Sequence, residues 1–307
     1  MAINKPSLPS KNGVSASTMV LPPLGSLSFT PGSLLSYLEQ STHNARRLDW
    51  EKRLKTGLVV DEQGASLPLD APYIAGQKIH YWRDAGIEQR IPFDEQIIYQ
   101  DEHILVADKP HFLPVTPSGG YVQETLLVRL KNRTGLADLT PMHRIDRDTA
   151  GLVMFCIRRQ DRDVYAAMFR ERRLSKTYEC IAPYSEHIAF PLLRKTRLVE
   201  SPDSFMQMAE AAGEPNSETH IELIERAGYL AKYRLHPITG KRHQLRVHMN
   251  ALGLPIMGDG IYPHLTPETA RPDYAQPLEL LAKSLSFVDP VTQKQCDFSS
   301  GFFLRLL

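Results

Sequence analysis

Two strand patterns constrain the fold of this chain most strongly. Residues 152–157 read LVMFCI, a continuous apolar run typical of a strand buried on both faces. Residues 229–236 alternate instead, with Tyr229, Ala231, Tyr233 and Leu235 on one face and Lys232, Arg234 and His236 on the other. Half-exposed strands of this kind are typical of antiparallel sheets. We therefore expect an α+β fold with a mixed, largely antiparallel sheet and flanking helices.

The chain of 307 residues divides into three stretches by pattern. Residues 1–30 are rich in Ser, Pro and small residues without periodicity, and we interpret them as a flexible arm. Residues 31–85 combine two short helical patterns with two short strand patterns and predict a small module. Its helical part is basic through Arg46, Arg47, Lys52, Arg53 and Lys55. Residues 92–307 interleave strands and helices and predict the main domain.

Two helices are expected in that main domain. Residues 161–173 are amphipathic, with Asp161 as a candidate cap. Residues 242–252 suit a second helix that ends at Gly253.

Composition narrows the class of protein. The apolar fraction of 42% supports a sizeable core. No run approaches the roughly 18 apolar residues that a membrane helix needs, and the N-terminus lacks the apolar core of a secretory signal. Three scattered cysteines make a disulfide framework improbable. We therefore expect a soluble, monomeric protein of the cytoplasm with no membrane partner.

The net charge of +1 conceals a segregation of charge along the chain. Residues 200–225 hold seven acidic residues and no Lys or Arg, whereas residues 226–249 hold six Lys or Arg and no acid. Residues 144–176 form a second basic run, with nine Lys or Arg against five acids. Such runs are more often solvated faces than nucleic-acid footprints, so their position relative to a site must decide.

Charged residues crowd the start of the predicted buried strand, in the segment MHRIDRDTAGLVMF at 142–155. An aspartate between two arginines is usually a surface ion-pair partner. Asp146, however, stands at the entrance of a strand that a rigid sheet would hold in place, and the following DTAG suits a tight turn. A glycosidase would need a second carboxylate about 5 to 9.5 Å away, which Asp148 does not obviously provide from a turn.

The segment HPITGKRHQLRVHMNALG at 236–253 carries the other candidate groups. On a helix Arg242 and Arg246 share a face, so one guanidinium could meet a carboxylate and the other a phosphate. His243 and His248 are five residues apart and do not form the helical pair of a zinc site, so we expect no metal. Tyr178, in a predicted strand, is either a core tyrosine or a flat face on which a base could stack.

Taken together, HRIDRDTAGL (143–152), RRLSKTYECIA (172–182) and PITGKRHQLRVHMNALGLPIMGD (237–259) resemble the RluA family of RNA pseudouridine synthases. The family pattern runs through an HR(L/I)D motif, a KxY motif, a PxTG(R/K)xHQ(I/L)RxH motif and a GxPIxGD motif, in this order. The flanking IIYQDEHILVADKPHFLPV and LELLAKSLSFVDP look like the family's first and last strands. The resemblance covers roughly residues 92–300.

The resemblance implies a pseudouridine synthase fold with an active-site cleft in the central sheet. Asp146 matches the aspartate that does covalent chemistry on the target uridine, and whether it attacks the base or the ribose stays open. Tyr178 matches the tyrosine that stacks on the base and is proposed to take the carbon 5 proton, and Arg246 the arginine that pairs with the aspartate. Arg144 matches the residue that fills the space of the extruded nucleotide, and Leu280 the apolar residue that closes the pocket.

The same resemblance implies RNA contacts by His143, Arg242 and His243, and a reaction without cofactor or metal. Ribosomal and transfer RNA are both open as targets. The 31–85 module loosely resembles the small RNA-binding domain of some family members. Ala150 and Lys241 depart from the commoner Ser and Arg, and the last motif lacks its usual histidine, which bears on substrate choice. The competing hypotheses are an inactive RNA-binding protein of this fold and a carboxylate-dependent glycoside hydrolase.

Overall fold

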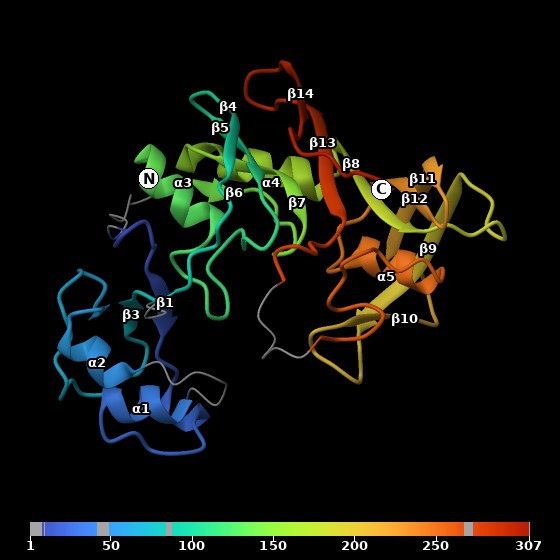
Figure 1. Cartoon of the computed structure of the whole chain (residues 1–307). Helices are drawn as coiled ribbons and strands as arrows, with labels where there is room; N and C mark the ends of the chain where they lie inside the picture. Colours follow the sequence, from blue (N-terminus) through green and yellow to red (C-terminus); the bar gives the residue numbers. More distant parts are fainter. Residues whose placement is uncertain (1–7, 9, 42–48, 84–87, 267–272, 307) are drawn as a thin grey trace. The chain divides into compact units, whose positions relative to one another are not determined.

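The computed structural model describes residues 8, 10–41, 49–83, 88–266 and 273–306, which fall into two compact units (Figure 1). The first unit comprises residues 1–88 with 119–123, and the second comprises residues 89–118 and 124–307. Among the described residues, no helix has the length and apolar character needed to cross a membrane.

The first unit packs two helices on a three-stranded antiparallel sheet. The helices are α1 (Leu34–Ser41) and α2 (Trp50–Lys55). The strands are β1 (Ser17–Val20), β2 (Val59–Val60) and β3 (Lys78–Tyr81), in the order β1-β3-β2. Asp49 caps α2 by accepting a hydrogen bond from the Lys52 backbone N–H at 2.8 Å. Leu34, Leu38, Trp50, Leu54 and Ile79 form part of its own buried core.

The structure corrects one expectation for this unit and limits another. Residues 1–30 are not an arm throughout, because β1 pairs with β3 and Leu21 is fully buried. A strand of four residues among prolines and serines has too little pattern to be recognised. Arg53, counted among the basic residues of the helical part, adds no charge to its surface, because it is buried and donates a hydrogen bond to the Trp82 carbonyl. Arg46 and Arg47 lie outside the described residues.

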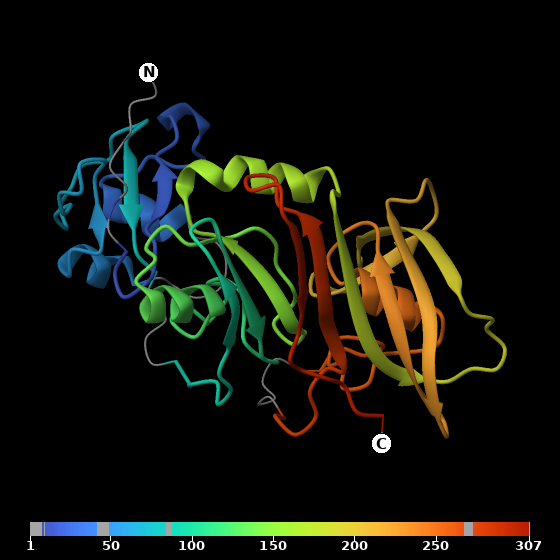
Figure 2. The same cartoon turned by 90° about the horizontal axis from the view of Figure 1, so that it is seen from above.

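The second unit contains a long sheet in the order β10-β9-β11-β12-β8-β13-β7-β5-β4, with two short strands alongside. Figures 1 and 2 show these strands side by side, with β13 near the middle of the sheet. The strands are β4 (Gln96–Gln100), β5 (Ile104–Lys109), β6 (Thr140–Pro141), β7 (Ala150–Cys156), β8 (Leu174–Pro183), β9 (Leu192–Glu200), β10 (Met208–Ala211), β11 (Ser217–Ala227), β12 (Leu230–Pro237), β13 (Leu280–Val288) and β14 (Gln295–Ser299).

The expected mixed, largely antiparallel sheet is confirmed. Among the described strands only β13 and β7 pair in parallel, with Leu281 opposite Ala150 and Ala282 opposite Gly151. β7 is buried along its whole length, as its apolar run predicts. β12 alternates as predicted, with Ala231, Tyr233 and Leu235 buried.

Three helices flank this sheet: α3 (Leu126–Thr134), α4 (Arg162–Arg170) and α5 (Gln244–Ala251). α4 covers β5, β7 and β13 through Tyr165 and Met168. α5 packs on β8, β11 and β12 through Leu245 and Met249. This second packing places the polar start of α5 beside the loop that leads into β7.

Two details differ from the expected pattern. Tyr229 is 75% exposed, because it lies in the turn before β12 and not on the buried face of that strand. Asp161 makes no capping hydrogen bond to α4 and instead pairs with His103 at 2.7 Å.

Candidate active site

A cleft of about 1090 Å³ opens in the second unit where several segments of the chain meet. Most of its lining comes from the loop before β7, the first half of β8, residues 236–246 and the start of β13, and further lining residues come from 114–118, from the end of α4 and the turn after it, and from Asn216. Asp146, Tyr178, Arg246, Arg144, His143, Arg242, His243 and Leu280 all line it. The tertiary structure therefore brings together every residue that the sequence proposed for a site.

Asp146 lies in the turn that leads into β7. The Thr149 backbone N–H donates to the Asp146 carbonyl at 3.2 Å, which closes the turn. The chain just after this turn is also fixed, because Gly151 of β7 packs directly against the Ala282 backbone of β13. The Asp146 side chain is 29% exposed, so its carboxylate reaches the cleft from a rigid support.

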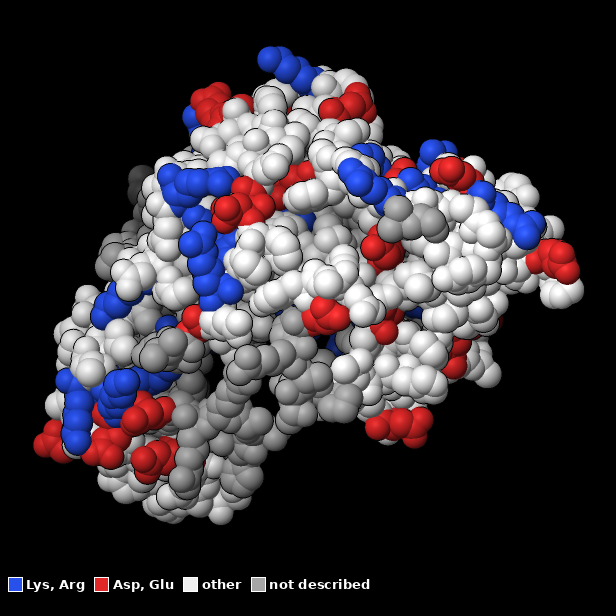
Figure 3. Space-filling model, in the orientation of Figure 1, with Lys and Arg blue, Asp and Glu red and all other residues white. Residues whose placement is uncertain are grey.

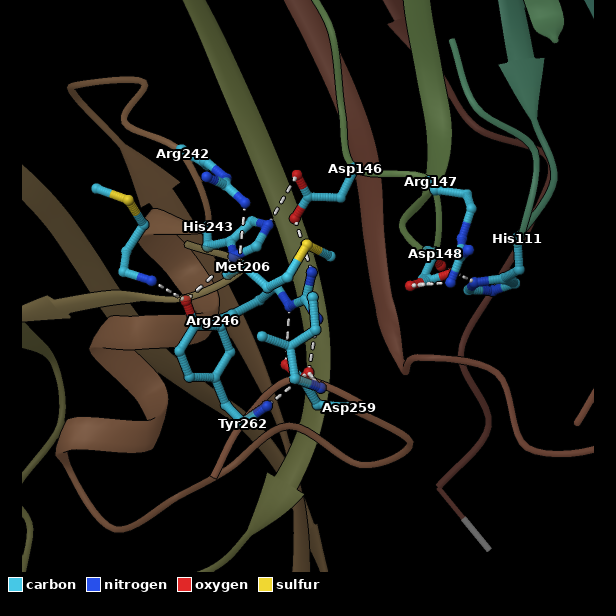
Figure 4. A network of polar contacts seen from close by, with 12 residues as sticks. His111, Asp146, Arg147, Asp148, Met206, Arg242, His243, Arg246, Asp259 and Tyr262 are labelled. Carbon is cyan, nitrogen blue, oxygen red and sulfur yellow. Dashed lines mark hydrogen bonds and ion pairs between the residues drawn. The ribbon is translucent and has the colours of Figure 1, made fainter. Parts of the chain in front are cut away.

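Arg246 holds the Asp146 carboxylate from below (Figure 4). Its Nη1 donates to Oδ2 of Asp146 at 3.0 Å, although the two residues are 100 positions apart. The remaining guanidinium donors, Nε and Nη2, form a bidentate pair with Asp259 at 2.8 and 2.6 Å. Burial of Arg246 would lower its pKa, but the hydrogen bonds and charges of the two aspartates raise that pKa above its ordinary value. The guanidinium is thus a permanent cation under the Asp146 carboxylate.

His243 faces the other oxygen of the same carboxylate. Its Nε2 lies 3.9 Å from Oδ1 of Asp146, and its Nδ1 lies 3.1 Å from the Tyr262 hydroxyl. That hydroxyl accepts a hydrogen bond from the Met208 backbone N–H at 2.7 Å, so its own proton is available to Nδ1. Burial lowers the pKa of His243. A neutral imidazole that accepts at Nδ1 carries its proton on Nε2, the nitrogen nearer Asp146.

Tyr178 and Leu280 form the less polar wall of the cleft. Tyr178 lies on β8 between Leu235 of β12 and Ala282 of β13. Burial and the negative charge of Asp146 both raise the pKa of the Tyr178 hydroxyl. Tyr178 therefore remains a neutral phenol in the lining of the cleft. Leu280 is almost fully buried at the start of β13.

His143 and Arg144 have different environments although they are adjacent. His143 Nε2 accepts a hydrogen bond from the Met154 backbone N–H at 3.1 Å, and its ring stacks on Phe169 at 5.0 Å. Burial and the charge of Lys176 lower the pKa of His143 to about 3, so it is neutral. This ring holds the loop onto β7. Arg144, by contrast, is exposed at the cleft.

Arg242 was expected to bind RNA phosphate, but in the structure its guanidinium donates hydrogen bonds to backbone carbonyls of the protein. Nη1 and Nη2 donate to the carbonyls of Phe205 and Met206 at 3.0 and 3.1 Å. The expected helix with Arg242 and Arg246 on one face is wrong, because α5 begins at Gln244 and Arg242 lies in the turn before it. The expected contact between one of the two guanidinium groups and a carboxylate is made by Arg246. His248 is a buried core residue, with Nε2 3.0 Å from the Thr196 and Ser217 hydroxyls and Nδ1 3.0 Å from the Thr219 hydroxyl. The described part of the chain contains no group of three or more metal-ligating side chains.

Three residues of the site were not assigned a role from the sequence. Asp259 ends the quoted GxPIxGD motif, which was the available indication, and it also accepts hydrogen bonds from the Ile261 and Tyr262 backbone N–H groups. Tyr262 lies in the segment GIYPHL, which differs from the family pattern in lacking the glycine that usually follows this tyrosine. Lys109, in the quoted HILVADKP segment, is fully buried and donates to the carbonyls of Pro110 and Arg147 at 2.9 Å. Burial lowers the pKa of Lys109 to about 7, against the charges of Asp148 and Asp146, which raise it.

Arg147 forms an ion pair with Asp148 at 2.8 Å, on the side of the turn away from Arg246 (Figure 4). Positive groups are otherwise concentrated around the cleft, where Arg144, Arg170, Arg172, Lys176 and Lys241 are among the lining residues. Elsewhere, on the face shown in Figure 3, Lys and Arg alternate with Asp and Glu without a broad surface of one sign.

Comparison with known proteins gives a consistent result. The family profile of RNA pseudouridylate synthases matches residues 103–251. The dual-specificity RNA pseudouridine synthase RluA of Haemophilus influenzae is 30% identical over 234 residues, which cover 70% of this chain and 98% of that relative. The mitochondrial tRNA pseudouridine(32) synthase of Saccharomyces cerevisiae is 31% identical over 171 residues, covering 54% of this chain and 37% of that relative.

Among solved structures, human RNA pseudouridylate synthase domain containing 1 shares the fold, with a TM-score of 0.57 at 22% sequence identity. The match covers 70% of this chain and 86% of that one. The carboxylate cleft, the sheet that carries it and these sequence relationships agree, and the chain belongs to the RluA family of RNA pseudouridine synthases.

Proposed function

We propose that this chain isomerises specific uridines of ribosomal or transfer RNA to pseudouridine, with Asp146 as the nucleophile. The observation that carries the proposal is the Asp146 carboxylate, exposed in a cleft and held from below by the buried Arg246. A buried cation under a carboxylate favours its ionised, nucleophilic form and fixes its direction. A pure RNA-binding protein has no need of this arrangement.

The reaction needs no external reactant, because the product has the same atoms as the substrate. The carboxylate of Asp146 forms a bond to the base or to the ribose, and the bond between N1 and the anomeric carbon breaks. The base turns, carbon 5 bonds to the anomeric carbon, and the bond to Asp146 breaks, which restores the carboxylate. The proton on carbon 5 leaves, and N1 gains a proton. The detached base must remain in place between these steps, and the walls formed by Tyr178 and Leu280 support this role.

The raised pKa of Tyr178 favours stacking over proton abstraction in the ground state, because a neutral phenol is a weak base. A uridine inside a helix must first be flipped out, at a cost of a few kcal/mol. Stacking on Tyr178 offsets part of that cost, and the exposed Arg144 is placed to occupy the vacated space in the RNA. The cationic groups around the cleft then bind phosphates.

The arrangement of acids disfavours glycoside hydrolysis by a carboxylate pair. Asp146 is the one acidic residue among the described residues that line the cleft. Asp259 lies nearby, but its side chain is almost fully buried and accepts hydrogen bonds from Nε and Nη2 of Arg246. A second carboxylate able to act as acid or base across a sugar is therefore missing from the lining.

We further propose that the chain acts as a monomer in the cytoplasm, where both candidate RNAs occur, since one chain supplies every group named here. The first unit is proposed to be an additional RNA-binding module. Lys52 and Lys55, both exposed on α2, support this role.

The test uses total RNA from cells that lack the gene, labelled with tritium at carbon 5 of uridine. Wild-type protein should release tritium and create pseudouridine at discrete positions. Asp146→Asn should lose at least about 10⁴-fold in rate, because the amide keeps the shape of the side chain but is not a nucleophile. Asp148→Asn, two residues along the same turn, should stay within about tenfold of wild type. Full activity of Asp146→Asn would refute the role of this residue.

A further inference from the structure

The loop between β9 and β10, residues 201–207, carries the most exposed aromatic side chain among the described residues. Phe205 is 78% exposed. A single exposed apolar residue needs no explanation on most surfaces. This ring is different because the backbone that presents it is tied to the active site.

Four hydrogen bonds tie the loop and the residue after it to the residues around the cleft. Arg242, which lines the cleft, donates to the carbonyls of Phe205 and Met206 at 3.0 and 3.1 Å (Figure 4). Next along the chain, Gln207 Nε2 donates to the Ile261 carbonyl at 2.6 Å. The Met208 N–H then donates to the Tyr262 hydroxyl, which lies beside His243.

The loop is also closed internally. The Ser201 N–H donates to the Gln207 carbonyl and the Gln207 N–H to the Ser204 carbonyl, both at 3.0 Å. Because the backbone is already ordered, a contact made by the Phe205 ring would cost little additional conformational entropy. The ring is thus displayed, at the edge of the cleft, on a support that does not need to fold on binding.

The charge of the surrounding segment limits what the ring can meet. Residues 200–225 contain seven acids and no Lys or Arg, and Asp203 is exposed in the same loop as Phe205. Such a segment repels phosphates. Any contact it makes with RNA must therefore involve the uncharged part of a nucleotide, and the face of a base is the part that stacks on an aromatic ring.

We propose that Phe205 is a stacking platform for an unpaired RNA base close to the target uridine. Phosphates lie on the basic groups lining the cleft, one base enters it to reach Asp146, and a second, nearby base lies on Phe205. This contact would select substrates with an unpaired nucleotide at a fixed distance from the target. The proposal rests on the proposed function of the cleft.

The chain offers a matched control in Tyr229, which is 75% exposed. Tyr229 precedes β12, whose other end supplies His236 and Pro237 to the cleft. His236 is seven positions along the strand from Tyr229, about 23 Å at 3.3 Å per residue. Tyr229 is thus an exposed aromatic residue of the same unit, placed away from the cleft.

The experiment compares Phe205→Ala, Phe205→Trp and Tyr229→Ala on the tritium-labelled total RNA. Stacking of one base corresponds to about 1–3 kcal/mol, so Phe205→Ala should raise KM by roughly 5- to 150-fold with kcat within about twofold of wild type. Phe205→Trp should keep a KM close to that of wild type, because its ring can also stack on a base. Tyr229→Ala should behave as wild type. The KM ratio of Phe205→Ala to wild type should be the same at low and high salt, because stacking releases no counterions.

A direct measurement separates this proposal from the proposed function. Trp50 and Trp82 both lie in the first unit, so Phe205→Trp adds a fluorophore at the loop, and total RNA should quench its emission after subtraction of the wild-type signal. Quenching without tritium release by wild type would support the platform and refute the enzymatic function. Three results would overturn the platform. The first is an unchanged KM for Phe205→Ala in an active enzyme, and the second is an equal rise of KM in Tyr229→Ala. The third is a Phe205→Ala protein whose oligomeric state changes while its KM does not.

Discussion

The two oxygens of the Asp146 carboxylate face two different residues near the start of α5, His243 just before the helix and Arg246 within it. Arg246 binds Oδ2, and the Nε2 of His243 faces Oδ1. Asp259 connects the residues behind both contacts. It binds the Arg246 guanidinium, and it also binds the backbone N–H of Tyr262, whose hydroxyl lies beside His243. The direction of the nucleophile thus depends on residues that do not themselves touch a substrate.

Removing the Tyr262 hydroxyl tests this dependence. Tyr262→Phe keeps the ring but leaves His243 Nδ1 without its donor, so His243 can take the other tautomer and turn its lone pair toward Asp146. We expect the single-turnover rate to fall about tenfold, the value of one hydrogen bond, with RNA affinity unchanged. Histidine nitrogen shifts measured by NMR should show a proton on Nε2 in wild type and a mixture of tautomers in the variant. A proton on Nδ1 in the wild type would contradict this account.

Lys109 gives the protein a specific dependence of stability on pH. Its pKa is lowered to about 7 in the folded protein by burial, against about 10.4 in the unfolded chain. Between these values the unfolded chain binds a proton that the folded protein does not, so the free energy of unfolding should rise with pH above 7. Below pH 7 both states are protonated and the cost of burying the charge is present in full.

Urea unfolding of wild type and Lys109→Met between pH 6 and 10 measures this effect. Relative to the variant, wild type should gain up to about 1.4 kcal/mol per pH unit above pH 7 and nothing below it. The slope is the relevant quantity, because methionine also loses two hydrogen bonds to carbonyls. Lys294→Met, at an exposed position, should keep the wild-type slope. Parallel curves for wild type and Lys109→Met would show that Lys109 stays charged.

At the scale of elements, the parallel pairing of β7 with β13 sets the position of the site. β7 follows the Asp146 turn and β13 begins at Leu280, so this parallel pair joins two walls of the cleft. Gly151 allows the approach, because its φ is +112° and a β-carbon there would lie 2.3 Å from the Ala282 carbonyl oxygen. The pair cannot form at this distance with any other residue.

Gly151→Ala should therefore destabilise the protein by about 3 kcal/mol or more and reduce activity in the same preparation, because the strands must separate. Gly228→Ala is the matched control. It also has a positive φ, +58°, but has open space around it, so only the backbone cost of about 1–2 kcal/mol applies. Chemical denaturation of both variants measures the difference. Equal losses would mean that the close contact with β13 is relaxed at no cost.

The elements that could be predicted from sequence are those with a strong period. The run at 152–157 and the alternation at 231–235 correspond to β7 and β12, and the helix expected at 242–252 corresponds to α5. The strand Ser17–Val20 was not recognised, because it is short and depends on its pairing with β3. The turn position of Tyr229 was missed for a related reason, since a hairpin turn decides where alternation begins.

At the scale of the whole molecule, the reacting groups belong to the second unit, and the first unit has its own core. This division supports a model in which chemistry and additional RNA binding are separate tasks. The charge that could bind RNA in the first unit is smaller than the sequence indicated, because Arg53 is buried and Lys55 pairs with Glu51.

The double variant Lys52→Glu, Lys55→Glu tests RNA binding by the first unit. If both lysines contact phosphate, RNA affinity should fall and the slope of log affinity against log salt should decrease by about two, with kcat unchanged. Lys294→Glu, a charge reversal on the second unit, should have little effect. Filter binding of total RNA over a range of salt concentrations gives the slopes. Unchanged affinity and slope would assign a purely structural role to α2.

The sequence by itself determined the class of fold and the family, and it led to the proposal of Asp146 as the reacting residue. Those properties follow from local periods and from motifs whose residues lie close together in the chain. The tertiary structure decided which guanidinium meets Asp146, because α5 begins at Gln244: Arg246 lies on the helix and turns toward Asp146, whereas Arg242 lies in the turn before it and binds loop carbonyls. It alone brought Asp259, Tyr262, Lys109 and the Phe205 loop into contact with residues that line the cleft. Contacts across 100 residues depend on strand order and register, and those long-range properties leave no period in the sequence.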